Sequence, residues 1–142
     1  MFSELEEQRV VRAIANAERG NRGEVQVRVE RRCAGDALTR AKALYKLAGL
    51  EGTEDDTGVL LYIASESRVS AVYCGAGVHT RSEASFWQGV SDRVAAGYRT
   101  GQPVDGICDA LGHIGDLLRT LLPGRDAAGN ERPDTLHTEE TA

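Results

Sequence analysis

The stretch Gly58-Val-Leu-Leu-Tyr-Ile-Ala64 decides the fold of this chain. It is a nearly continuous apolar run with a glycine in front and the polar Ser65-Glu66-Ser67 behind, a pattern typical of a buried strand. A second stretch suited to a strand, 68–74, follows after three polar residues. Because so short a link cannot form a parallel crossover, we expect the two strands to make an antiparallel hairpin.

The residues before the hairpin predict a further strand and a helix. The stretch 24–30 alternates valine with polar residues, as a strand with one face on the core does. Asp36 is suited to cap a helix over 37–48, whose apolar residues form one stripe. Strand, helix and strand in this order make a right-handed βαβ unit, so 24–30 should run parallel to 58–64 and the sheet should be mixed.

Three more helices complete the predicted fold. Ser3 and Thr80 are each followed three residues later by glutamate, the pattern of a capping box at a helix start. Pro103 suits the first turn of a last helix, which should end before Pro123. We therefore predict an α/β fold, a three-layer α/β/α sandwich with a small mixed sheet and helices on both faces.

Composition limits the possible functions. The 142 residues, 41% hydrophobic and 27% charged, suit a single domain, which we expect over 1–123, with a disordered acidic tail over 124–142. A formal net charge of −5 argues against a nucleic-acid partner. With no apolar run near the ~20 residues of a membrane span and no signal pattern, we expect a cytoplasmic protein without direct membrane insertion. Three scattered cysteines argue against a disulfide framework.

The topology brings two distinctive loops to the same end of the sheet. The loop entering the buried strand contains Asp55 and Asp56. The loop leaving its hairpin partner contains Gly75 and Gly77, and Glu83 follows at a helix start. Carboxylates and loop carbonyls together suit calcium or magnesium, whereas loop amides at a helix start suit a phosphate. A polar connection, a glycine turn and an ordinary helix cap explain the same residues without any ligand.

Other candidate sites have weaker patterns. Four side chains that bind metals in other proteins lie along one face of the last helix, namely Asp105, Asp109, His113 and Asp116. A solvated helix face explains them better, because a metal would need further ligands from elsewhere. The Gly75 loop lacks the third glycine of a dinucleotide fingerprint, so we expect no organic cofactor. The catalytic residues, if any, are unknown: at the acidic end His79 is the one side chain suited to act as a base.

Several segments, taken in order, resemble a known family. They are Gly23-Glu-Val-Gln-Val-Arg-Val-Glu30, Cys33-Ala-Gly-Asp36, Arg40-Ala41, Leu44-Tyr-Lys-Leu-Ala-Gly-Leu50, Thr53, Thr57-Gly-Val-Leu-Leu-Tyr-Ile-Ala64, Gly75-Ala-Gly-Val78, Phe86-Trp87 and the closing Leu-Leu-Pro123. Together they resemble the TPM domain of thylakoid-lumen and photosystem II repair proteins. They are more similar to its short soluble bacterial branch, which lacks a signal and a membrane anchor. The resemblance covers about residues 3 to 123.

The resemblance implies an α/β/α sandwich and two properties of relatives. Some members bind calcium, and plant members have been assigned acid phosphatase activity. The family's Asn/Asp-Gly-Val-Leu step is matched here by Asp56-Thr57-Gly58, with one residue intervening. Glu83 stands nearest to the place where the secreted branch has an aspartate, and the opening Val-x-Asp-x-Ala-Gly-Leu-Leu segment of that branch is missing. These departures count against the phosphatase.

Two functions remain as expectations, beside a third possibility of a pure scaffold without a metal. The favoured one is an accessory module that binds a protein partner, with a divalent cation, calcium or magnesium, at Asp55, Asp56 and Glu83. Its partner would be a membrane-anchored TPM protein or a LemA-type protein, whose genes are often neighbours of this branch. The alternative is a weak metal-dependent acid phosphatase acting on phosphate monoesters, in which the amides of Gly75 and Gly77 hold the phosphate.

Overall fold

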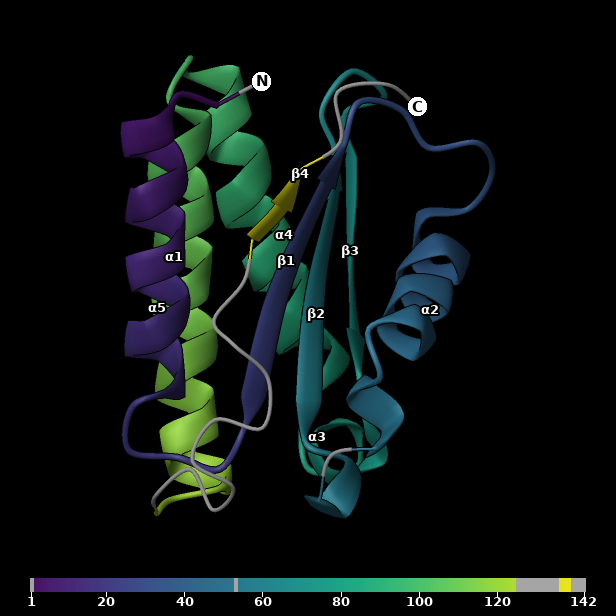
Figure 1. Ribbon diagram of the computed structural model, residues 1–142, viewed down its shortest axis with the longest axis vertical. Helices are drawn as coiled ribbons and strands as arrows, with labels where there is room; N and C mark the ends of the chain where they lie inside the picture. Colours follow the sequence, from purple (N-terminus) through teal and green to yellow (C-terminus); the bar gives the residue numbers. More distant parts are fainter. Residues whose placement is uncertain (1, 53, 125–135, 139–142) are drawn as a thin grey trace.

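The computed structural model describes residues 2–52, 54–124 and 136–138. A central sheet has helices on both faces (Figure 1). The helices are α1 (Glu4–Glu18), α2 (Ala37–Leu47), α3 (Ala76–His79), α4 (Ala84–Arg99) and α5 (Pro103–Leu121), and the strands are β1 (Glu24–Glu30), β2 (Gly58–Ala64), β3 (Val69–Cys74) and β4 (Leu136–Thr138). Two single 3-10 turns, η1 (Leu50–Gly52) and η2 (Glu54–Asp56), lead into β2. The predicted three-layer sandwich is confirmed.

The sheet has the predicted mixed topology. Its strand order is β3-β2-β1-β4, and β1 pairs with β2 in parallel from Glu24 opposite Gly58 to Glu30 opposite Ala64. β2 and β3 form the antiparallel hairpin. Both the βαβ unit and the hairpin are therefore confirmed.

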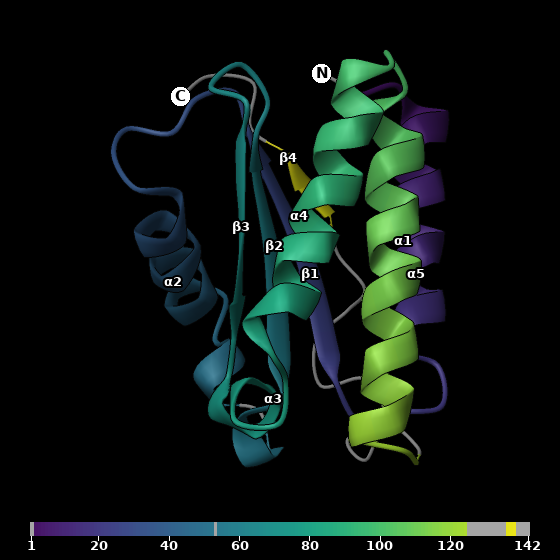
Figure 2. The same ribbon diagram turned by 180° about the vertical axis from the view of Figure 1, so that it is seen from behind.

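The two faces of the sheet have separate cores. The helices α1, α4 and α5 cover one face and α2 covers the other (Figure 2). In β2, Leu61 belongs to the three-helix core, while Leu60 and Tyr62 belong to the core under α2. All seven residues of β2 are buried, which is why its sequence is a continuous apolar run rather than an alternation.

The predicted helix start at Thr80 is wrong. A one-turn helix, α3, already begins at Ala76, and Thr80 is its C-cap residue, with its hydroxyl donating to the carbonyl oxygen of Ala76 at 2.8 Å. The long helix α4 begins at Ala84, with Glu83 in the N-cap position and no side-chain cap bond. The carboxylate of Asp56, 20 residues away in sequence, accepts the hydrogen bond of the Ala76 N–H in the first turn of α3. The local capping pattern at Thr80 therefore does not decide where the helix begins.

The segment 124–142, predicted to be a tail without ordered structure, contains a strand. β4 pairs in parallel with β1, with Leu136 opposite Val27 and Thr138 opposite Val29. Leu136 also packs against the three-helix core, which explains why this apolar side chain anchors the segment. For 136–138 the prediction is therefore wrong, and 125–135 and 139–142 lie outside the described residues.

Candidate ligand site at the Asp56 loop

The carboxylate of Asp56 joins three elements at the end of the sheet where α3 lies (Figure 1). Its Oδ1 accepts a hydrogen bond from the Tyr45 hydroxyl of α2 at 2.8 Å. Its Oδ2 accepts one from the backbone N–H of Ala76, the first residue of α3, at 2.9 Å. The Asp56 side chain therefore satisfies an N–H at the start of α3 from 20 residues away along the chain.

The two glycines of the predicted loop lie in direct contact with the aspartate turn. A Cβ at Gly75 would lie closer than 3.0 Å to the carbonyl oxygen of Asp56, and one at Gly77 would lie as close to the carbonyl oxygen of Asp55. Neither glycine has the positive φ that would explain its presence by backbone freedom. Glycine is required here because two pieces of backbone pack against each other, which confirms that the topology brings these two loops together.

The aspartate turn itself has an uncommon backbone. Asp55 has a φ of 61° and Asp56 a φ of 52°, both in the left-handed region. Aspartate is among the residues that adopt this region most readily, because its short side chain can satisfy nearby polar groups. The two consecutive left-handed residues lead the chain directly into β2.

The phenol of Tyr45 stays protonated at this site. Tyr45 is 1% exposed, and burial, followed by its contact with Asp56, raises the pKa of its hydroxyl above the ordinary value for tyrosine. The hydroxyl is therefore a lasting donor to the carboxylate. The sequence placed Tyr45 in the apolar stripe of its helix and did not assign it to the site. The signal that could have found it is that a buried tyrosine hydroxyl normally has a polar partner.

Asp55 lies at the outer side of the same turn. Its Oδ2 is 3.3 Å from Nη1 of Arg22, and 63% of its side chain is exposed. Arg22 is held in place by its backbone, since its N–H donates to the carbonyl oxygen of Leu122 at 2.9 Å and its carbonyl accepts from the Thr57 hydroxyl at 3.1 Å. An exposed ion pair of this kind contributes little stability, so the Asp55 carboxylate is available to other ligands.

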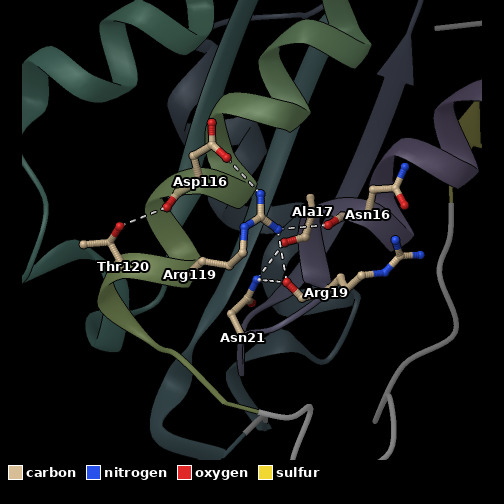
Figure 3. A network of polar contacts seen from close by, with 7 residues as sticks. All are labelled: Asn16, Ala17, Arg19, Asn21, Asp116, Arg119 and Thr120. Carbon is tan, nitrogen blue, oxygen red and sulfur yellow. Dashed lines mark hydrogen bonds and ion pairs between the residues drawn. The ribbon is translucent and has the colours of Figure 1, made fainter.

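A polar network fixes the chain just before Arg22 (Figure 3). The guanidinium of Arg119 on α5 donates to the carbonyl oxygens of Asn16 and Arg19 at the end of α1, each at 3.1 Å. The Asn21 side chain donates to the carbonyl oxygen of Ala17 at 2.7 Å and accepts from the N–H of Gly23 at 2.8 Å. The network thus ties α1 to α5 and sets the start of β1.

The predicted cation ligands come together only in part. Asp55 and Asp56 are neighbours on one turn, whereas Glu83 lies beyond α3 in the N-cap position of α4. Within the described ranges, no group of three His, Cys, Asp or Glu side chains has the arrangement of a metal site. Calcium prefers six to eight oxygen ligands, and both oxygens of Asp56 already accept hydrogen bonds. The three predicted carboxylates therefore do not form a cation cage in the described part of the chain.

The acidic face of α5 is occupied by ion pairs and a ring contact. Three of its carboxylates face arginines, in the pairs Arg9–Asp105, Arg93–Asp109 and Arg119–Asp116. The His113 ring stacks on Phe86 with centroids 4.4 Å apart. The three aspartates are 55%, 69% and 79% exposed, as expected for the solvated helix face that the sequence indicates.

The chain belongs to the TPM domain family. The model of the TPM domain matches residues 1–117, which is most of the sequence. This agrees with the resemblance seen in the sequence and with the α/β/α fold.

Two solved structures have the same fold. The NMR structure of the BA42 protein from the psychrophilic bacterium Bizionia argentinensis is 24% identical, with a TM-score of 0.88, and the match covers 98% of this chain and 96% of that one. The N-terminal domain of the cg2496 protein from Corynebacterium glutamicum is 11% identical, with a TM-score of 0.65, over 83% of this chain and 74% of that one. No curated protein matches the sequence. No helix of the described part is both long and apolar enough to cross a membrane.

Proposed function

We propose that this chain is a cytoplasmic accessory module that binds a protein partner and holds a divalent cation, calcium or magnesium, beside Asp55 and Asp56. One observation carries the proposal: both oxygens of Asp56 accept hydrogen bonds that hold the fold together, from Tyr45 and from the backbone of Ala76. A carboxylate committed in this way is poorly suited to act as a base or to bind substrate. Asp56, which the sequence analysis placed among the cation ligands, is better explained as a residue that connects elements of the fold.

The connection gives a partner a fixed surface. The aspartate turn, α3 and α2 are joined through one side chain, and backbone packs on backbone at Gly75 and Gly77. Loops held in one conformation lose little entropy on binding, which favours recognition by a protein. The partner we propose is a membrane-anchored TPM protein or a LemA-type protein, as the family resemblance implies.

In this proposal the cation is held mainly by Asp55. Its carboxylate is 63% exposed, and a hard cation prefers carboxylate oxygens. When bound, the cation would compete with Arg22 for the carboxylate and would stiffen the turn. Glu83, which lies beyond α3, is not needed for this version of the site.

Thermal melts with and without calcium or magnesium test the cation. A cation present at 100 times its dissociation constant that binds only the folded state adds about 2.7 kcal/mol of stability. We expect the midpoint to rise for the natural chain and for the control variant Asp92→Asn, and not for Asp55→Asn. Asp92 is an exposed aspartate on α4 whose side chain bonds to Gln88, away from the turn. No rise with either cation would remove the cation from the proposal.

The partner and the phosphatase alternative need separate measurements. We expect the purified chain to form a stable complex, by size-exclusion chromatography, with the soluble domain of an anchored TPM protein or of a LemA-type protein from the same genome. If the chain forms a complex with neither protein, the proposed partner is wrong. For the alternative, we expect no hydrolysis of p-nitrophenyl phosphate above buffer with calcium, magnesium or manganese at acidic pH. Hydrolysis that is lost in Asp55→Asn and kept in Asp92→Asn would make the phosphatase the better function.

A further inference from the structure

A cleft lies at the opposite end of the sheet from the Asp56 loop. It has a volume of about 540 Å³ and opens between the turn of the β2–β3 hairpin and the second half of α4. Cavities of this size hold small molecules in many proteins. Nothing in the proposed cation and partner sites uses this region, so the cleft requires its own explanation.

The inner wall of the cleft is apolar with two hydroxyls beside it. Ile63 of β2 and Val94 of α4 are both 2% exposed and form the buried side of the cleft. The hydroxyls of Ser65 and Tyr98 lie 2.9 Å apart and join the hairpin turn to α4. An apolar wall with a few hydroxyl groups is typical of a site for an organic ligand.

Two arginines line the cleft from its two sides. Arg68 comes from the hairpin turn and Arg99 from the last turn of α4. Both are exposed, and neither forms an ion pair with any carboxylate of the described part of the chain. Among the described arginines, Arg12, Arg19, Arg28 and Arg81 also have no carboxylate partner, whereas seven others do, namely Arg9, Arg22, Arg31, Arg32, Arg40, Arg93 and Arg119. Two uncompensated charges therefore stand at the cleft of a chain with a formal net charge of −5.

The backbone at Arg68 supports a role for this residue. Its φ is 56°, in the left-handed region. Residues other than glycine, asparagine and aspartate adopt this region less often. Such conformations have a cost and concentrate at binding sites. Here the cost falls on a residue that lines the cleft.

Nearby negative groups are already neutralised. The carboxylate of Glu66 in the hairpin turn is within ion-pair distance of Arg31 and Arg32. The C-terminal end of α4 is the negative end of the helix dipole. There the Ala96 carbonyl oxygen accepts hydrogen bonds from both the N–H and the hydroxyl of Thr100. The groups that would repel an anion are therefore largely satisfied, and the positive charge of the two arginines remains.

We propose that the cleft binds a small organic anion, a carboxylate or phosphate attached to an apolar body. The acidic group lies between Arg68 and Arg99, and the apolar body lies on Ile63 and Val94. Guanidinium groups bind carboxylate and phosphate oxygens through paired N–H donors, so both acidic groups fit. This inference is independent of the cation and the partner at the other end.

The binding test uses the fluorescent probe 8-anilinonaphthalene-1-sulfonate, which has an anionic group on an apolar ring system. We expect saturable binding to the folded natural chain. The double variant Arg68→Ala/Arg99→Ala should bind the probe at least about tenfold more weakly, the ratio that corresponds to about 1.4 kcal/mol. The control Arg12→Ala, an exposed arginine on α1, should bind it as the natural chain does.

A second variant fills the cleft without changing charge. Ala95 is an exposed residue of α4 that lines the cleft, and Ala95→Trp should abolish probe binding while the circular dichroism melt stays that of a folded protein. Displacement by octanoate or by octyl phosphate distinguishes the two acidic groups, and inorganic phosphate alone should displace the probe poorly. Equal probe binding by the natural chain, the double arginine variant and Ala95→Trp would overturn the proposal.

Discussion

The two ends of the sheet use their charged side chains in opposite ways. At the Asp56 end, one carboxylate holds α2, α3 and the turn before β2 through two hydrogen bonds, and glycine allows the backbones to meet. At the hairpin end, Arg68 and Arg99 line an open cleft without carboxylate partners among the described residues. Satisfied polar groups stabilise a fold, whereas uncompensated exposed charges add little to it and are available to ligands. Loss of the Asp56 side chain should therefore cost stability, whereas loss of Arg68 and Arg99 should cost anion binding and little stability.

The largest effect that tests this comparison should come from Gly75→Ala. The new methyl group would collide with the carbonyl oxygen of Asp56 and with the Tyr45 hydroxyl. We expect a loss of more than about 3 kcal/mol in the free energy of unfolding, at or beyond the upper range for overpacking. Urea unfolding followed by the fluorescence of Trp87, the single tryptophan, measures it. The control Gly112→Ala, where nothing lies within 4 Å, should stabilise α5 by about 0.5–1 kcal/mol.

The next largest effect should come from Asp56→Ala. This change leaves the buried Tyr45 hydroxyl and the Ala76 N–H without their acceptor. We expect the free energy of unfolding to fall by about 3 kcal/mol, because a buried donor without an acceptor is not compensated for its loss of hydration. The neighbouring change Asp55→Asn should cost no more than about 0.5 kcal/mol, because its ion pair is exposed. Similar losses for the two variants would mean that Asp56 has no special structural role.

A smaller effect should appear in alkaline solution. The pKa of Tyr45 is raised in the folded protein, so its contribution to stability is complete below pH ~10, where the unfolded tyrosine is still protonated. Above that pH the unfolded chain loses the proton first, and stability should fall by up to about 1.4 kcal/mol per pH unit for this residue. Urea midpoints from pH 8 to pH 11 should decline more steeply for the natural chain than for Tyr45→Phe. Equal slopes would contradict the assignment.

The smallest effect should come from the hairpin end. Arg68→Ala/Arg99→Ala removes two exposed charges that lack carboxylate partners in the described part, so the free energy of unfolding should change by less than about 0.5 kcal/mol. The same urea experiment measures it. A loss as large as that of Asp56→Ala would show that the two ends do not differ in the way proposed.

Much of the fold could be predicted because its patterns are local. The continuous apolar run of β2, the alternation of β1 and the short hairpin link each follow from the side-chain environment of a single strand. The βαβ rule then gave the direction of the strands and placed the aspartate turn beside Gly75. Predictions of this kind need no knowledge of side-chain packing.

The remaining features depend on contacts between distant residues. Asp56 satisfies the first turn of α3 across 20 residues, which moved a helix boundary that the local pattern at Thr80 placed elsewhere. The sequence predicts Tyr45 in the core because it falls on the apolar stripe of its helix, whereas its hydroxyl partner belongs to another element. The cleft exists only because α4 packs over the hairpin, and no short motif in the sequence marks it.

The pairing of β4 with β1 also bears on self-association. A sheet edge with open main-chain N–H and C=O groups is a template on which a second molecule can add a strand. The segment 136–138 covers part of that edge, opposite Val27–Val29. A chain shortened before Leu136 would expose this part of the edge and should be more prone to oligomerise or aggregate. The strand at 136–138 therefore occupies main-chain groups of β1 that a second molecule could otherwise pair with.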